Sequence, residues 1–404
     1  MKAYRWLTVC VVLSLLVASC APQPTPTPTP KPQPTTVKPT AVPPTAPPPT
    51  PVPAPAGPLV GVTVEPDETY YMVTFVSGDP YWKDCFRGMQ DAAKLLGVKA
   101  VYMGTETTDP VQEATVMEQV MTKNPAGIAV TCVDPDGMKG SIDKAIAAGI
   151  PVVTFDADAP MAKRYSFLAT GNYAAGVTAA RALAQAIGGK GEVATSNVTG
   201  QLNQLQRQQG FEDTLAAEFP EIKLVARTDN KEDATIAAQT IAAALQAHPN
   251  IKGVFAANAS GGAGVARGVA EVGKKGQVQI VSFDFNPDTL DLIDKGEIYA
   301  TIGQGTWQMG FWSTFFLFMV KHNLIKSVSD WKAAGISPLP GYVDTGTVII
   351  TKENSKFWRG LDELGSTLET PPKGLPGLTE PDETYYMVTF VSGDPYWKDC
   401  FRGM

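Results

Sequence analysis

Acidic and amide side chains follow several short apolar segments of the chain, where buried strands would end. They are Asp79, Asp156 with Asp158, Asn258, Asp284 and Gln304, and the aromatic residues Tyr81 and Trp82 stand near the first of them. One such residue is commonly a helix cap or a turn residue. Five segments that end this way, with aromatic rings nearby, indicate a concave binding site with convergent polar groups. Because these groups suit vicinal hydroxyls and the flat C–H face of a ring, they indicate a sugar or polyol ligand.

The same residues give little support to catalysis. The chain has two histidines, His248 and His322, and neither is part of a nucleophile motif, which argues against a Ser-His-Asp arrangement. Asp156 and Asp158 resemble the paired carboxylates of a glycosidase, but they share one short turn and no second catalytic segment is evident, so an enzyme stays a remote alternative. The run 134–137 begins like a calcium loop and lacks the later ligands, so we expect no metal and no cofactor.

A glycine-rich run, 259–264, follows a predicted strand and opens a predicted helix. It resembles a phosphate-binding loop only superficially, because it lacks the Gly-Lys-Ser/Thr ending and has Arg267 where a dinucleotide fingerprint requires glycine. We therefore interpret it as a helix N-terminus close to the ligand.

Short continuous apolar strands that alternate with amphipathic helices must position these residues. The sequence predicts strands at 70–76, 99–102, 127–132 and 151–155, and again at 192–196, 222–227, 253–257 and 279–283. Helices are predicted up to residue 96 and at 110–122, 139–148, 201–218, 234–246 and 262–272. This pattern is typical of an α/β fold with two similar lobes, each a doubly wound parallel sheet. Segment 301–305, helix 307–320 and strand 343–351 would cross back between the lobes, and ligands bind beyond the carboxyl ends of such strands.

The N-terminal region indicates export. Lys2 and Arg5 precede an apolar run, 6–17, which is typical of a signal peptide, and residues 16–20 resemble the lipobox of bacterial lipoproteins. We expect cleavage before a lipidated Cys20; the alternative is an ordinary secretory signal with an incidental cysteine. Residues 21–66 form a proline-rich linker that cannot bury a core and could extend on the order of 100 Å. The folded part is therefore expected outside the cytoplasm, anchored to the outer face of the cell membrane or in the periplasm.

Charge and cysteines set further limits. The net charge is −7 and no basic cluster occurs among the 404 residues, so nucleic-acid binding is not expected. Of five cysteines, Cys85 and Cys132 lie in the predicted globular part. We expect them to be buried free thiols, with a disulfide as the alternative.

Residues 65–89 recur letter for letter as residues 380–404, after a C-terminal linker at 363–379. The first copy supplies a predicted strand and the start of a helix, and both copies cannot occupy that place. One hypothesis is that the second copy competes for it, in its own chain or through strand exchange between chains. The alternative is a recent duplication or a cloning artefact. We otherwise expect a monomer.

The chain resembles the type I periplasmic sugar-binding proteins of the ribose-binding kind, which feed ABC transporters. The resemblance covers about residues 69–360 and is carried by Ser77–Trp82, Gly127–Val130, Ala148–Asp158, Gly171–Gly176, Gln209–Phe211, Val254–Asn258, Ser282–Asp284 and Ala300–Gln304. It implies two α/β lobes joined by three hinge crossovers that close on a monosaccharide. Lobe 1 would comprise 67–171 and 305–342, and lobe 2 would comprise 172–304 and 343–362.

The resemblance also implies roles for individual residues. Asp79 falls at the place of a polar ligand contact, and Asp156 and Asp284 match aspartates that bind the ligand. Asn258 matches an amide ligand, Gln304 the hinge glutamine, and Tyr81 and Trp82 the stacking aromatics. Two arginines of ribose-binding relatives are replaced, at Ala157 and Leu205. The ligand contacts of these arginines would be made instead by Asp158, Gln201, Asn203 and Gln204. This change suits another aldose, a deoxysugar or a polyol better than ribose.

The expected function is therefore extracytoplasmic capture of a monosaccharide or polyol and its delivery to an ABC transporter permease. A ligand-sensing subunit for a membrane receptor is the alternative. Repressors that share the fold begin with a helix-turn-helix, whereas this chain begins with the signal peptide and linker.

Overall fold

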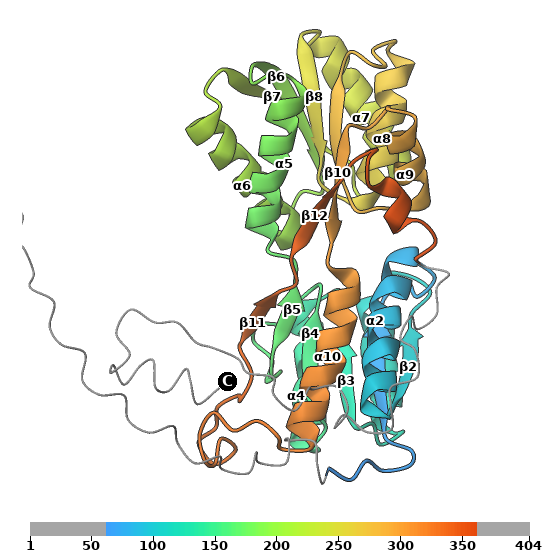
Figure 1. Ribbon diagram of the computed structural model, residues 1–404, viewed down its shortest axis with the longest axis vertical. Coiled ribbons are helices and arrows are strands. Elements are labelled where there is room, and N and C mark those ends of the chain that lie inside the picture. The colour runs from blue at the N-terminus through green and yellow to red at the C-terminus, as the bar shows by residue number, and fades with distance from the viewer. Residues whose placement is uncertain (1–61, 362–404) are drawn as a thin grey trace, which may run out of the picture. The chain divides into compact units, whose positions relative to one another are not determined.

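The computed structural model describes residues 62–361, and these form two α/β lobes, each built on a six-stranded sheet (Figure 1). The first sheet contains β1 (Thr69–Thr74), β2 (Lys99–Gly104), β3 (Gly127–Val130), β4 (Val152–Phe155), β5 (Phe167–Ala169) and β11 (Tyr342–Asp344), in the order β11-β5-β4-β3-β1-β2. The second contains β6 (Gly191–Asn197), β7 (Ile222–Asp229), β8 (Ile251–Ala256), β9 (Gln279–Phe283), β10 (Ala300–Gln304) and β12 (Thr347–Ile350), in the order β12-β10-β9-β8-β6-β7. The two orders correspond strand for strand, which confirms the prediction of two similar lobes.

All strand pairs are parallel except β10 with β12, which is antiparallel. The central strands read as unbroken apolar runs because helices cover both faces of each sheet. Tyr70, Met72 and Val73 of β1 are almost fully buried, for example. The first lobe has the helices α2 (Pro80–Leu96), α3 (Pro110–Met121), α4 (Pro135–Ala147) and α10 (Thr306–Lys321). The second has α5 (Asn172–Ala186), α6 (Leu202–Glu218), α7 (Ala234–Ala247), α8 (Ala259–Glu271), α9 (Pro287–Asp294) and the 3₁₀ turn η1 (Ser355–Trp358).

The sequence Asp-Pro starts three helices of the first lobe. Asp79, Asp109 and Asp134 each accept a hydrogen bond from a backbone N–H of the first turn, while the following proline occupies the first helical position. An aspartate cap also suits the positive end of the helix dipole. Asp134 therefore caps α4, which begins at Pro135 and not at residue 139 as predicted. Within 62–361 no group of acidic, histidine or cysteine residues is arranged to hold a metal ion.

Two helix pairs pack with backbone against backbone. A Cβ atom on Gly310 of α10 would lie 1.8 Å from the carbonyl oxygen of Cys85 in α2, and one on Gly176 of α5 would lie 2.0 Å from that of Arg207 in α6. Any side chain at these positions would push the helices apart. The α2–α10 contact is visible in Figure 1, and the α5–α6 contact fixes the helix that carries Arg207.

The chain passes between the two sheets three times, between β5 and α5, between β10 and α10, and between β11 and β12. The three crossovers are hydrogen-bonded to one another: the N–H of Gly171 and that of Gly346 both donate to Asp344 Oδ1, at 2.9 and 2.8 Å, and the N–H of Gly305 donates to the carbonyl oxygen of Gly346 at 3.2 Å. Gly346 has φ 80°, a conformation that favours glycine. The predicted three-crossover hinge is thereby confirmed.

Some sequence predictions need correction. The single strand predicted at 343–351 is two strands, because the turn at Gly346 separates them; Val343 and Asp344 pair with β5, in the first lobe and not the second. The three-residue β5 and the helices α5 and α9 were not predicted. The aromatic run of α10 packs in the first lobe, with Trp312 still 42% exposed. Cys85 and Cys132 are buried free thiols, as predicted.

No helix among residues 62–361 is both long and apolar enough to cross a membrane. The predicted signal peptide, Cys20, most of the proline-rich linker, the linker at 363–379 and the repeat at 380–404 lie outside the described residues.

Candidate functional site

Asp156 and Asp284 occupy equivalent positions in the two lobes. Each follows a phenylalanine at the carboxyl end of the fourth strand of its sheet, and each has a left-handed backbone, with φ 60° and 64°. The N–H of Asp156 donates to Leu168 O at 3.0 Å, and the N–H of Asp284 donates to Ile302 O at 2.9 Å. A positive φ at a residue other than glycine costs energy and concentrates at functional sites. The fold therefore holds both carboxylates just beyond the ends of the strands.

In the first lobe, Asp156 is paired with Tyr81, which lies in the first turn of α2. The Tyr81 hydroxyl donates to Asp156 Oδ1 at 2.6 Å. Burial raises the pKa of Asp156, and the hydrogen bond from Tyr81 opposes that change. Burial also raises the pKa of the Tyr81 phenol well above its ordinary value, so it stays a donor. Asp79 caps the same turn, with Oδ1 accepting from the Tyr81 N–H at 2.8 Å.

In the second lobe, Gln304 at the end of β10 orients Asp284. Its Nε2 donates to Asp284 Oδ1 at 2.8 Å, and its Oε1 accepts from Thr170 Oγ1 at 2.7 Å and from Arg207 Nη2 at 3.2 Å. Thr170 belongs to one crossover and Gln304 immediately precedes another, so the glutamine joins the hinge to the site. The role of Gln304 as a hinge residue that contacts the ligand stays a prediction.

Arg207 is a buried residue of the polar site that the sequence analysis did not predict. It is 3% exposed, donates to Asn172 Oδ1 at 2.8 Å and to Ala257 O at 2.9 Å, and lies 3.7 Å over the Phe283 ring. The prediction that Leu205 replaces the arginine of this helix was wrong, because Leu205 is 44% exposed. Helical periodicity carried the signal: Gln204, Arg207, Gln208 and Phe211 share one buried face of α6 at the spacing i, i+3, i+4, i+7.

The pKa of Asp284 is raised to about 6, chiefly by burial. Arg207 and the hydrogen bond from Gln304 oppose the change, whereas the carboxylates of Asp156 and Asp79 reinforce it. Burial lowers the pKa of the Arg207 guanidinium, and Asp284 and Asp156 raise it again. Residues of both lobes thus act on one another electrostatically, as expected for a single polar site.

An amide cluster completes the second-lobe side. Asn258, the cap of α8, donates through Nδ2 to Gln204 Oε1 at 3.0 Å and to Asn230 Oδ1 at 2.8 Å. Gln204 Nε2 donates to Gln201 Oε1 at 2.6 Å and to Glu232 Oε1 at 3.1 Å. The structure thus brings Asn258, Gln204 and Gln201 together, and adds Asn230 and Glu232, which were not predicted. The interpretation of 259–264 as a helix start beside the site agrees with this cap.

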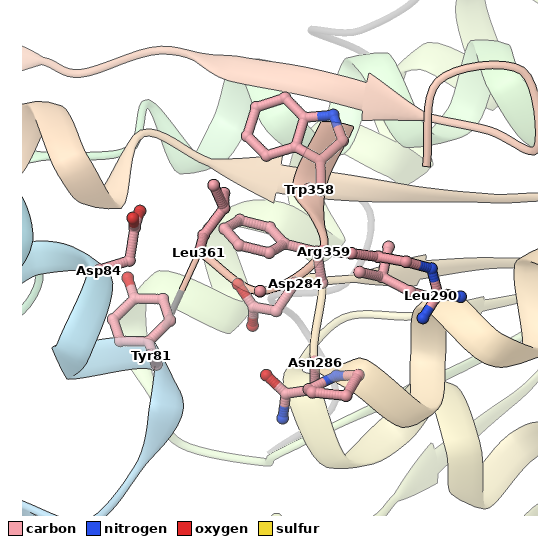
Figure 2. Close-up of a pocket in the computed structure, with 11 residues that line it drawn as sticks. Tyr81, Asp84, Asp284, Asn286, Leu290, Trp358, Arg359 and Leu361 are labelled. Carbon is pink, nitrogen blue, oxygen red and sulfur yellow. The ribbon is translucent and has the colours of Figure 1, made fainter. Parts of the chain in front are cut away.

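A small cavity of about 70 Å³ adjoins the polar residues (Figure 2). Tyr81 and Asp284 line it as well as belonging to the polar site, and the remaining walls come from α2, the start of α9 and the segment 358–361. Figure 2 shows Tyr81 and Asp84 on one side of the cavity and Trp358 with Leu290 on the other.

Comparison with known proteins decides the family. Residues 70–321 match the family model described as periplasmic binding protein domain. The chain belongs to the type I periplasmic sugar-binding proteins. An arabinose-binding protein from Geobacillus stearothermophilus is 44% identical with a TM-score of 0.69, and the match covers 72% of this chain and 99% of that one. A sugar-binding protein of an ABC transporter from Bacillus halodurans is 44% identical with a TM-score of 0.70, over 72% of this chain and all of that one. The D-allose-binding periplasmic protein of Escherichia coli is 28% identical, over 63% of this chain and 86% of that protein.

Proteins of this family bind sugars for import and are not enzymes, and membership places the protein outside the cytoplasm. The parallel-sheet lobes, the three crossovers and the polar residues beyond the strand ends all fit the periplasmic sugar-binding fold.

Two residues assigned to the sugar site, Asp158 and Trp82, have other surroundings in the structure. Both Asp158 oxygens are held by Arg164, at 2.7 and 2.5 Å, and Oδ1 also accepts from Thr154 Oγ1 at 2.6 Å. Asp158 is therefore part of an ion pair that stabilises the loop after β4, and the prediction that it binds ligand needs correction. Among the described residues, Asn203 Oδ1 accepts one hydrogen bond, from the N–H of Gln204 at 2.8 Å, and a ligand role for Asn203 stays a prediction.

Trp82 does not offer an open stacking face. It is 4% exposed and packs edge to face against Phe75, Tyr81 and Phe155, with ring centroids 5.2, 4.8 and 5.9 Å away. Trp82 supports the Tyr81 ring from behind, so Tyr81 is the aromatic residue of the pair that borders the site.

Proposed function

We propose that the protein captures an aldopentose, with arabinose as the first candidate, and delivers it to an ABC transporter permease while anchored through lipidated Cys20. The 44% identity to an arabinose-binding protein over 72% of the chain supports this ligand class. The E. coli protein named for D-allose is less similar, at 28%.

The arrangement of Asp156, Asp284 and Arg207 carries the proposal. Two carboxylates from equivalent places in the two lobes accept hydrogen bonds from adjacent hydroxyls, and a buried guanidinium donates to the ring or hydroxyl oxygens between them. Since each lobe supplies part of this set, a ligand held by both favours their association around it. A monosaccharide has the required ring of alternating donors and acceptors.

The test is to measure how residues 62–361 bind L-arabinose, D-ribose, D-xylose, D-allose and xylitol. Calorimetry measures the affinity for each compound, and the shift in melting temperature measures the stabilisation that it gives. A sugar that binds near 1 μM and is present at about 1 mM should stabilise the fold by roughly 4 kcal/mol. We expect arabinose to give the largest shift. If none of the three pentoses moves the transition, the aldopentose proposal is wrong.

A matched pair of arginine variants tests the site itself. Arg207→Met removes the buried guanidinium, and we expect sugar affinity to fall roughly tenfold to a hundredfold, since a hydrogen bond from a charged group contributes about 1.5–3 kcal/mol. Arg267→Met is the control, because Arg267 is an exposed residue of the same lobe whose ion pair within 62–361 is with Glu271. Equal effects of the two changes would contradict the assignment.

The anchor is tested separately with the full chain. Cys20→Ser should move the protein from the membrane fraction to the soluble fraction of the cells that express it, without a change in sugar affinity. A wild-type chain that is itself soluble would exclude lipidation.

A further inference from the structure

The cavity beside Asp284 has two kinds of wall. Phe285, Leu290 and Trp358 form an apolar side, while the polar lining residues are Tyr81, Asp84, Asp284, Asn286 and Arg359. A cavity of 150 Å³ can hold benzene, so the volume here, about 70 Å³, suffices for about three non-hydrogen atoms. This is the size of a short substituent and not of a second sugar ring.

The segment after β12 forms a fixed wall of this cavity. Ser355 Oγ donates to Asp294 Oδ1 at 2.6 Å, and Arg359 donates to Asp294 at 2.6 Å and to Asp291 at 2.9 Å, which ties the segment to α9. The Trp358 ring lies 5.2 Å from that of Phe285. Four attachments to one helix and its preceding loop hold Trp358 in place.

One oxygen of Asp284 is available on the polar side. Asp284 is 6% exposed. The only hydrogen bond that its side chain makes within 62–361 is the one that Oδ1 accepts from Gln304, so Oδ2 has no partner there. Asp84 is different, because Arg87 and Thr306 occupy both of its oxygens. A hydroxyl that entered the cavity would therefore find Asp284 as its acceptor, and its carbon atom would contact the apolar wall.

We propose that this cavity is a specificity subsite for a short exocyclic group of the bound sugar, such as a hydroxymethyl group or the methyl group of a glycoside, with Trp358 and Leu361 as its walls. The proposal rests on the proposed function, since Tyr81 and Asp284 belong to both the polar site and the cavity. A ring held by Asp284 then directs a neighbouring substituent into the cavity. The ligand class widens from a bare pentopyranose to hexoses of the same ring configuration.

The experiment compares each pentose with the sugar that adds one exocyclic group to the same ring. The pairs are L-arabinose with D-galactose, D-xylose with D-glucose, and D-ribose with D-allose, together with the two methyl glycosides of the pentose that binds. We expect at least one substituted sugar to bind within tenfold of its pentose or more tightly. If every substituted sugar binds more than a hundredfold more weakly while the pentose binds, the subsite is wrong and the proposed function stands.

Variants that fill or enlarge the cavity separate the subsite from general effects. Leu361→Phe should weaken the substituted sugar at least tenfold and leave the pentose within twofold. Trp358→Ala enlarges the cavity and should favour the longer substituent of an ethyl glycoside. Phe357→Ala is the control, because Phe357 lies in the same turn but is 70% exposed and does not line the cavity. If Leu361→Phe weakens the affinity for the pentose and for the substituted sugar equally, the proposal is wrong. If the wild-type protein binds no sugar at all, both the subsite and the proposed function are refuted.

Discussion

Glu113 is a buried carboxyl group whose ionisation opposes folding. It lies in the first turn of α3, is 0% exposed, and accepts one hydrogen bond, from the Val133 N–H to Oε2 at 3.0 Å. Its Oε1 has no hydrogen-bond partner within 62–361. Burial raises the pKa of Glu113 from 4.5 to about 7, against the lowering effect of the Val133 hydrogen bond.

The sign of the pH effect follows from that change. Because the pKa is higher in the folded state, the stability contribution of the protonated group is complete below about 4.5 and is lost as the pH rises through about 7. One pKa unit corresponds to about 1.4 kcal/mol. Ionisation of Glu113 therefore lowers the free energy of unfolding by about 3 kcal/mol at pH 8, but by less than about 1 kcal/mol at pH 5.

Glu113→Gln removes this cost and keeps an acceptor for the Val133 N–H. We expect the variant to match the wild type within about 1 kcal/mol at pH 5 and to exceed it by about 2–3 kcal/mol at pH 8, which is roughly 5 °C in melting temperature. Urea unfolding at both pH values measures the difference. Glu106→Gln is the control, because Glu106 is exposed and should change stability little at either pH. A Glu113→Gln variant with the same pH profile as the wild type would refute the reasoning.

Three further predictions concern the site and the packing of the first lobe. Because the pKa of Asp284 is about 6, sugar affinity should rise about tenfold between pH 5 and pH 7.5 as the carboxylate forms, and calorimetry of Asp284→Asn should show no such rise. Gly310→Ala places a Cβ atom 1.8 Å from a backbone oxygen of α2 and should cost at least about 2 kcal/mol in urea unfolding, whereas Gly140→Ala, in open space on α4, should not destabilise. Trp307→Phe removes the hydrogen bond of 2.7 Å to the buried Asp91 and should cost about 1–3 kcal/mol, and an unchanged unfolding midpoint would show that the bond contributes nothing.

The fold was predictable from the sequence because its information is local. Unbroken apolar strands such as 127–130 and 279–283 and the Asp-Pro starts of α2 and α3 can be read from neighbouring residues, although the same start of α4 was missed. The three-residue β5 gives too short a signal, and α5 is rich in alanine, with a weak contrast between its faces. Two strands of different sheets that only a short turn separates, as β11 and β12 are by the turn at Gly346, look like one continuous strand in the sequence.

The site was predictable where a residue ends a strand, as Asp156 and Asp284 do. It was not predictable where a partner decides the role. Asp158 has the same sequence context as Asp156, and only the position of Arg164 shows that its oxygens are occupied. Arg207 lies well inside α6, so its approach to the site depends on the rotation of that helix against α5.

The hydrogen-bonded contact between α2 and α10 has a consequence for how the protein folds as it is made. Thr306 reaches Asp84 across a sequence separation of 222 residues, and β11 at 342–344 is the edge strand of the sheet that has β1 inside it. The first lobe therefore cannot be completed until the entire second lobe except β12 and η1 has been synthesised. Contacts of such long range slow folding, and the part of the first lobe that is made early lacks α10 and β11 through most of translation. An exported protein benefits from this order, since a chain that has not folded can still pass through a membrane channel.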